Sequence, residues 1–347
     1  MYSWLGKIIA EEVSESTWQQ AKAVALADIS RAKAFGITSA NVDVMIQARS
    51  QLLKSVLPDF RQFCQTNLRA DYEAMLAVLW DLWLPLGMKL AAHRQSLNRP
   101  LIQGILGVQG TGKTTMCQVL SLILQQLGYR SLSWSLDDLY KTYSDRLILL
   151  QQDPRLIWRG PPGTHDVDLG LNVLEQIRQG KTSVTVPRFD KSLYAGAGDR
   201  TTPEIVTNID IVLFEGWFVG VRPIDPKAFE ITPPPIITDT DKAFARDMNQ
   251  QLSNYLPLWD CLDSLILLYP TDYRSSLEWR KQAEQQMVAA GKSGMSDLQI
   301  EEFVNYFWRS LHPELFLKPM LRSPSVADVV VEICPDRTFG AVYQTEC

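Results

Sequence analysis

The sequence predicts an α/β fold in which helices flank a doubly wound, mostly parallel sheet, with an all-helical region in front of it. Two observations lead to this prediction. From about residue 100 of the 347-residue chain, strand-like apolar runs alternate with helical ones, which is the pattern of a parallel sheet with crossover helices. Before that point, apolar residues recur at three- and four-residue spacing, which indicates amphipathic helices. We therefore expect a helical extension at residues 1–98, packed on an α/β domain at residues 99–347.

The composition is that of an ordinary globular enzyme and excludes some other classes. The formal net charge of −5 argues against nucleic acid as a partner, because a groove for phosphate backbones needs a basic excess. The five cysteines form no C-x-x-C pair, so zinc is not expected and a reducing compartment fits. We find no stretch of the length needed to span a bilayer and no signal sequence, so we expect no membrane partner and a cytoplasmic location. The oligomeric state is left open.

Three helical stretches precede the sheet, at residues 16–35, 41–65 and 72–97. The last is strongly aromatic and apolar, although Pro85 should break or kink it. A helical layer on the core is the expected arrangement, with a partner-binding surface as the alternative.

A phosphate-binding motif follows the first predicted strand, residues 101–106. Residues 107–114 read GVQGTGKT and match G-x-x-x-x-G-K-[ST], and a helical run with Gly128 as its C-terminal stop comes next. Strand, glycine loop and helix together aim backbone N–H groups at a phosphate chain. Lys113 would reach the β- and γ-phosphates, and the Thr114 hydroxyl would bind Mg²⁺. The residues expected to bind nucleotide here are Gly107, Gln109, Gly110, Thr111, Gly112, Lys113, Thr114 and Thr115.

The remaining elements continue the alternation, and with the glycine loop they predict a P-loop NTPase fold. Further strands are expected at residues 131–135, 183–187, 211–215, 264–269 and 328–334. Further helices are expected at residues 167–179, 272–290 and 296–309, the last opening with Ser296 and Gln299 in capping-box spacing. The proline-rich stretch at residues 231–235, in the long connection between Phe218 and Trp259, is expected to be a surface loop and not a linker.

Acidic residues end two of these strands, where ligands of such sheets bind. Asp137 and Asp138 follow the second strand, and a carboxylate there can accept a proton from an attacking hydroxyl or hold a metal-bound water. Capping of a helix N-terminus is the alternative for either one, and the two can divide these roles. Glu215 ends the strand at residues 211–215 and is expected to orient Mg²⁺, with a purely structural glutamate as the alternative.

A block of cationic and polar residues lies on loops between these acids. Glycines and prolines indicate ordered loops, and the cations supply donors for anions. Each charge alone fits an ordinary solvated residue, but together they predict a pocket for an acceptor substrate. The residues in question are Arg159, His165, Asp166, Arg188, Lys191 and Arg200.

The chain resembles the D-glycerate 3-kinases of plants, cyanobacteria and fungi, a branch of the uridine kinase, phosphoribulokinase and pantothenate kinase group. Short sequence motifs carry this resemblance, and they occur in the same order as in that family. The resemblance covers about residues 100 to 320 and is loose before that. It rests on the segments QGTGKTT (109–115), SLDDLY (135–140), RG and THD (159–166), RFDKS (188–192), GDR (198–200), FEGW (214–217), WRKQAE (279–284) and GKSGMS (291–296).

The resemblance implies transfer of the γ-phosphoryl group of ATP to the 3-hydroxyl of D-glycerate, a reaction of photorespiration in plants. It implies Asp137 as general base, with Thr114, Asp137 and Glu215 around Mg²⁺ and Lys113 on the phosphates. The loop residues above, with Asp138 and Tyr140, would bind glycerate. Residues 272–296 would form a lid carrying Arg274, Arg280 and Lys281. Adjacent helical residues diverge by about 100°, so we expect Arg280 to face the phosphates while Lys281 remains solvated.

Three alternatives are weighed against this reading. A uridine, pantothenate or ribulose-phosphate kinase of the same group shares the glycine loop and both acids. A regulatory GTPase is disfavoured because no N-K-x-D motif is present. A non-catalytic assembly protein is disfavoured because Lys113, Asp137 and Glu215 are all present.

Overall fold

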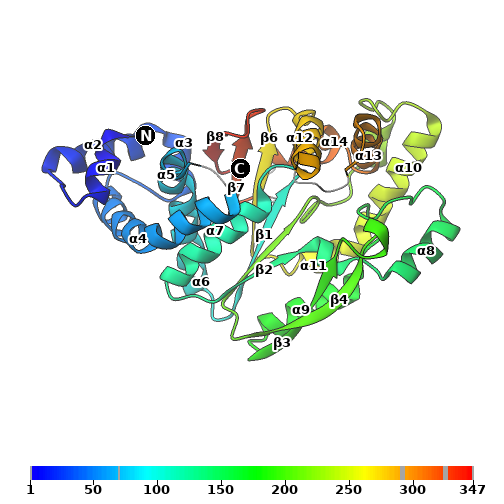
Figure 1. The fold of residues 1–347 in the computed structure, drawn as a ribbon, viewed down its shortest axis with the longest axis horizontal. Helices are drawn as coiled ribbons and strands as arrows, with labels where there is room; N and C mark the ends of the chain where they lie inside the picture. The colour runs from blue at the N-terminus through cyan, green and yellow to red at the C-terminus, as the bar shows by residue number, and fades with distance from the viewer. Residues whose placement is uncertain (1, 69–70, 290–293, 323–326, 346–347) are drawn as a thin grey trace.

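A six-stranded sheet forms the centre of the computed structural model, which describes residues 2–68, 71–289, 294–322 and 327–345. The strand order is β2-β5-β1-β6-β7-β8 (Figure 1). All pairs are parallel except β7 with β8, which is antiparallel. The fold prediction is therefore confirmed. The strands of this sheet are β1 (Leu101–Gly107), β2 (Ser131–Ser135), β5 (Ile211–Gly216), β6 (Ser264–Pro270), β7 (Val329–Ile333) and β8 (Phe339–Tyr343).

The register of the central strands sets the position of the site. Strands β1 and β5 are buried along their whole length, as expected for continuous apolar runs covered on both faces. Ser135 pairs with Glu215, and Leu106 pairs with Gly216. The carboxyl ends of β2, β5 and β1 therefore lie side by side, and the residues that follow these strands meet at one edge.

The predicted helices after β1 are present. Helix α7 begins at Lys113, and α13 begins after Ser296 with the expected capping box to Gln299. The longer helices of this region are α7 (Lys113–Gln126), α8 (Tyr143–Gln152), α9 (Val167–Arg178), α10 (Asp239–Gln251), α12 (Ser275–Ala289) and α13 (Asp297–Ser310). The short ones are η3 (Leu136–Leu139), η4 (Tyr194–Gly196), η5 (Pro226–Phe229), η6 (Leu252–Tyr255), α11 (Leu256–Trp259), α14 (Pro313–Phe316) and η7 (Lys318–Arg322).

The segment before residue 98 is helical, as predicted, and gathers at one end of the molecule (blue in Figure 1). Helices α4 and α6 pack on α7, while α3 packs on β8, where Arg31 Nη2 donates to the carbonyl of Gly340 at 3.3 Å. The division of the chain at residue 98 stays a prediction. The elements are α1 (Ser3–Ile9), α2 (Glu15–Ala27), α3 (Ile29–Ala34), α4 (Val42–Phe63), η1 (Cys64–Leu68), α5 (Tyr72–Val78), η2 (Leu79–Trp83) and α6 (Leu84–Ser96).

The run Tyr72–Ser96 departs from two expectations. Pro85 does not break it, because the proline sits in the first turn of α6, directly after the π-helical η2. The run is also long and apolar enough to cross a membrane by length and composition, so the expectation that no stretch reaches that length is wrong. In this fold, 61% of its apolar window is buried within the protein, as in a core helix.

The strand predicted at residues 183–187 is present, but it lies outside the central sheet. It belongs to β3 (Ser183–Asp190), which pairs antiparallel with β4 (Asp199–Thr207) in a separate hairpin that extends away from the central sheet (Figure 1). Strands β4 and β8 were not predicted. The proline-rich stretch at residues 231–235 forms no helix or strand, as expected, but the connection from Phe218 to Trp259 also contains α10, which was not predicted. Thr238 and Asp241 form its capping box.

Candidate active site

The glycine loop has the geometry that its sequence demands. Gly110 and Gly112 both adopt φ of +86°, a left-handed conformation that side chains disfavour. A Cβ atom on Gly110 would lie only 2.8 Å from Cβ of Trp279, so α12 packs directly on this loop. Thr111 is buried, and its Oγ1 donates to the carbonyl of Val108 at 2.8 Å. The loop is therefore held rigid at the amino end of α7, where it can present N–H groups to phosphates.

Lys113 extends along the same loop, and its Nζ donates to the carbonyl of Val108 at 3.2 Å. Burial of the ammonium lowers the pKa of Lys113, although the charges of Glu215 and Asp137 act in the opposite direction. The two carboxylates therefore share the electrostatic environment of the lysine that is expected to bind phosphate.

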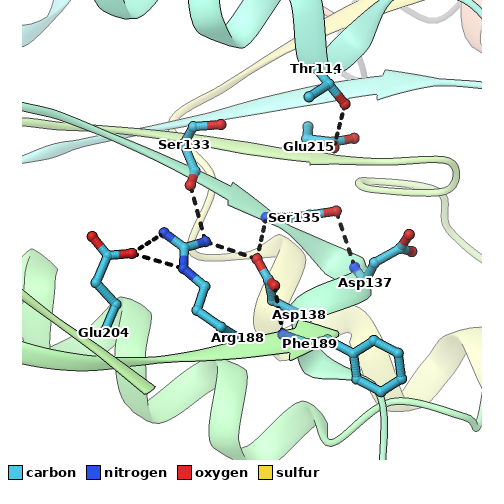
Figure 2. A network of polar contacts seen from close by, with 9 residues as sticks. All are labelled: Thr114, Ser133, Ser135, Asp137, Asp138, Arg188, Phe189, Glu204 and Glu215. Carbon is cyan, nitrogen blue, oxygen red and sulfur yellow. Dashed lines mark hydrogen bonds and ion pairs between the residues drawn. The ribbon is translucent and has the colours of Figure 1, made fainter. Parts of the chain in front are cut away.

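Thr114 and Glu215 are joined directly. Thr114 Oγ1 donates to Oε1 of Glu215 at 3.2 Å, and the glutamate is buried (Figure 2). A hydroxyl and a carboxylate are hard oxygen ligands that suit Mg²⁺, which in nucleotide sites keeps several waters and binds substrate phosphates. Within the part of the chain that the structure describes, no group of three or more His, Cys, Asp or Glu side chains forms a metal cage. The donor set therefore fits a Mg²⁺ ion that arrives with a nucleotide.

The two aspartates after β2 have different surroundings, because η3 turns them apart. The Ser135 hydroxyl accepts a hydrogen bond from the N–H of Asp137, and the Asp138 carboxylate accepts one from the N–H of Ser135 (Figure 2). Asp138 also accepts from Arg188 Nη1 at 2.9 Å and from the N–H of Phe189 at 3.1 Å. Its oxygens are thus occupied in joining β2 to the β3–β4 hairpin.

Asp137 instead bonds to side chains. Its Oδ2 accepts from Lys191 Nζ at 2.6 Å, and its Oδ1 accepts from the Tyr140 hydroxyl at 2.8 Å. Burial acts to raise the pKa of Asp137, but the Lys191 charge and the two hydrogen bonds outweigh it, so the pKa is lowered. The carboxylate is therefore ionised at neutral pH, which is the state that a proton acceptor requires.

Tyr140 connects this carboxylate to two more predicted residues. Its ring stacks on the His165 imidazole with centroids 4.6 Å apart, and the Arg159 guanidinium lies 5.9 Å from its centroid. Arg159 Nη1 donates to the carbonyls of Gly196 and Ala197, and among the described residues no carboxylate pairs with it. We call the five residues of this group the acceptor cluster: Asp137, Tyr140, Arg159, His165 and Lys191.

The other predicted substrate residues bond mainly to one another and to the protein around the acceptor cluster. We call them the frame residues: Asp138, Asp166, Arg188 and Arg200. Arg188 bonds to Glu204 through Nε and Nη2, in addition to Asp138, so three of its nitrogens contact the protein. Asp166 caps α9 by accepting the N–H of Leu169, and it pairs with Arg200 Nη2 at 2.8 Å. Arg200 also donates to the carbonyl of Tyr140. The frame residues thus hold the segments that carry the acceptor cluster.

The expected lid residues make protein contacts. Arg280 pairs with Glu284, whose carboxylate is buried and also accepts the N–H of Met295. Lys281 is not solvated as expected, because it pairs with Glu301 on α13 at 3.2 Å. Arg274 is exposed beside Asp272. The lid prediction extends over residues 290–293, which lie outside the described residues.

One further residue, Tyr255, reaches the acceptor cluster without being predicted. It lies on η6, in the connection between Phe218 and Trp259, and its hydroxyl is 2.8 Å from Nδ1 of His165. The two residues are 90 positions apart, so no local pattern could have paired them.

Comparisons with known proteins find several related kinases, although no family model matches the chain. The chain is 33% identical over 221 residues to an uncharacterized kinase of Schizosaccharomyces pombe, a match covering 60% of this chain and 79% of the other. It is 30% identical over 255 residues to the chloroplastic D-glycerate 3-kinase of Arabidopsis thaliana, a match covering 70% of this chain and 52% of that protein. The solved structure of D-glycerate 3-kinase from Cryptococcus neoformans has a TM-score of 0.66 and 30% identity, over 74% of this chain and 95% of the other.

Proposed function

This chain belongs to the D-glycerate 3-kinase family of P-loop kinases, and we propose that it transfers the γ-phosphoryl group of ATP to the 3-hydroxyl of D-glycerate. The observation that carries this proposal is the acceptor cluster itself. An ionised carboxylate, Asp137, lies at the sheet edge that carries the phosphate loop and bonds to the Tyr140 hydroxyl. The Arg159 guanidinium, which pairs with no carboxylate among the described residues, lies over the same Tyr140 ring. A proton acceptor beside an anion-binding group suits a small hydroxy acid.

We propose that the phosphate loop and α7 bind ATP, with Lys113 on the β- and γ-phosphates. Thr114 and Glu215 would hold Mg²⁺, which when bound neutralises charge on the phosphates. Since phosphoryl transfer depends mainly on positioning and charge stabilisation, the rigid loop and the oriented Glu215 supply what the reaction requires.

Asp137 would take the proton of the attacking 3-hydroxyl. Tyr140 and Lys191 orient its carboxylate through the two hydrogen bonds at 2.8 and 2.6 Å. Both donors also keep the carboxylate ionised. Asp138 is the weaker candidate for the base, because Arg188, Phe189 and Ser135 already bond to its oxygens.

Arg159 is the proposed partner of the glycerate carboxylate. A guanidinium binds a carboxylate best through two parallel N–H groups. Among the described residues, Arg159 bonds to protein carbonyls through Nη1 alone. The frame arginines differ, because Arg188 and Arg200 are each paired with acidic side chains. A cytoplasmic location and a role in photorespiration belong to the same proposal and rest on the family resemblance.

An acceptor screen tests this function. Purified protein with ATP and Mg²⁺ would be assayed for ADP formation with D-glycerate, L-glycerate, uridine and pantothenate. We expect activity with D-glycerate and none with uridine or pantothenate. Activity confined to a nucleoside or to pantothenate would assign the chain to another substrate of the wider kinase group.

A further inference from the structure

His165 is a buried histidine with unequal ring nitrogens. The residue is only 3% exposed, and its Nδ1 lies 2.8 Å from the Tyr255 hydroxyl. Its Nε2 is buried and has no hydrogen-bond partner among the described residues. Burial lowers the pKa of His165 to about 3, although the charge of Asp137 acts in the opposite direction. The ring is therefore neutral at physiological pH and carries one proton, on either Nδ1 or Nε2.

The surroundings of Tyr255 decide which nitrogen carries that proton. The backbone N–H of Gly163 donates to the Tyr255 oxygen at 2.8 Å. Tyr255 is fully buried, and Nδ1 of His165 is the acceptor within reach of its proton in the described structure. If Nδ1 were protonated, the phenol oxygen would face two donors and its own proton would be buried without an acceptor, which is costly. Tyr255 therefore donates to Nδ1, and the imidazole proton resides on Nε2.

This assignment leaves one buried donor, Nε2–H, within the acceptor cluster. The His165 ring stacks on Tyr140, whose hydroxyl bonds to Asp137. A protonated Nε2 cannot accept the proton of a substrate hydroxyl, so it does not compete with Asp137 as a base. A donor on the attacking oxygen would also make that oxygen a weaker nucleophile. The N–H therefore suits an oxygen of the acceptor that does not react.

We propose that Tyr255 is a positioning residue that fixes His165 as the Nε2–H tautomer, and that this N–H donates to a non-reacting oxygen of the hydroxy-acid acceptor. The proposal rests on the proposed function of the site. It accounts for a buried imidazole nitrogen that has no hydrogen-bond partner among the described residues. It also gives the acceptor cluster a neutral donor on a ring that stacks on Tyr140, the residue that the Arg159 guanidinium also contacts.

The tautomer can be observed in the full-length wild-type protein by long-range ¹H–¹⁵N correlation of its three histidines. The His165 signals are assigned by their loss in His165→Gln. We expect a protonated Nε2 and an unprotonated Nδ1, and a shift of the Nε2–H resonance on titration with D-glycerate. A protonated Nδ1 would overturn the assignment of the tautomer, and an unmoved Nε2–H resonance would overturn the contact with substrate. A shift without kinase activity on D-glycerate would count against the proposed function alone.

Kinetics of Tyr255→Phe test the positioning role. Loss of the phenol proton should let both tautomers form, raising the KM for the acceptor by about tenfold while the KM for ATP is unchanged. Tyr306→Phe is the matched control, because it removes another buried hydroxyl, bonded to the Trp158 carbonyl and not to His165. If Tyr255→Phe keeps the wild-type tautomer and acceptor KM, or if Tyr306→Phe raises the acceptor KM equally, the positioning role is wrong. The wild-type spectrum tests the tautomer even if Tyr255→Phe does not fold.

Discussion

Nζ of Lys191 lies 2.6 Å from Oδ2 of Asp137, so the β3–β4 hairpin places a cation on the carboxylate at the end of β2. This contact lowers the pKa of Asp137 and couples the hairpin to the proposed base. The Lys191 side chain is 61% exposed, so the contact is open to solvent on the lysine side.

The first prediction concerns pH. Because Lys191 lowers the pKa of Asp137 below its usual value of 3.8, the base form persists until the pH falls through the lowered pKa. Lys191→Met should raise that pKa, so the acidic limb of kcat/KM should move to higher pH. Lys191→Arg, which keeps the charge, is the control. An acidic limb at the same pH in wild type and Lys191→Met would show that the pair does not control the base.

The second prediction separates the two aspartates. Asp137→Asn should lower kcat by about 10²–10⁴-fold with little change in ATP affinity, because it removes a proton acceptor while preserving shape. Asp138→Asn should instead lower the free energy of unfolding by about 2 kcal/mol, since it weakens a bond to the Arg188 guanidinium. Steady-state kinetics and urea unfolding of both variants provide the check. If kcat is near normal in Asp137→Asn but falls strongly in a folded Asp138→Asn variant, Asp138 is the base and Asp137 is not.

The third prediction concerns Mg²⁺ and ATP. Glu215→Gln should raise the Mg²⁺ concentration for half-maximal activity by about 10–100-fold, because the carboxylate orients the Thr114 hydroxyl and the ion. Lys113→Ala should weaken ATP binding and lower kcat together, since its charge acts on the phosphates. Titrations of Mg²⁺ and of ATP distinguish the two variants. Unchanged Mg²⁺ dependence in Glu215→Gln would remove the glutamate from the proposed metal site.

The fourth prediction concerns Arg280, which was expected from the sequence to bind nucleotide. Arg280 pairs with the buried Glu284, so Arg280→Ala should lower the free energy of unfolding by about 3 kcal/mol. Glu284→Gln should be less destabilising when Arg280 is already alanine than in the wild-type protein. A double-mutant cycle of unfolding free energies measures this coupling. ATP affinity measured in parallel tests the nucleotide role: normal affinity in a folded Arg280→Ala would exclude it.

Much of this architecture could be predicted because its signals are local. The glycine loop follows a continuous apolar strand and opens an amphipathic helix. Asp137 and Glu215 each stand at the end of a strand that was predicted from its own residues. The capping box of Ser296 and Gln299 could likewise be predicted from the three-residue spacing of these side chains. These features depend on residues close in sequence.

The parts that could not be predicted depend on distant pairing or weak periodicity. Strand β4 has few buried residues and contains Pro203, so only its pairing with β3 makes it a strand. Helix α10 is strongly polar apart from a few buried positions such as Phe244 and Met248, and it follows a proline-rich stretch. The ion pair between Asp138 and Arg188 could not be predicted either, because 50 residues separate these partners in the sequence.

The position of the phosphoryl group on glycerate is the most direct test of the proposed function. Wild-type protein would be incubated with ATP, Mg²⁺ and ¹³C-labelled D-glycerate, with Asp137→Asn as the matched control, and the product identified by ³¹P and ¹³C NMR. We expect 3-phosphoglycerate from the wild type and at most a small fraction of it from Asp137→Asn in the same time. Phosphorylation at the 2-hydroxyl, or no phosphorylated glycerate from a folded, ATP-binding protein, would contradict the proposed function.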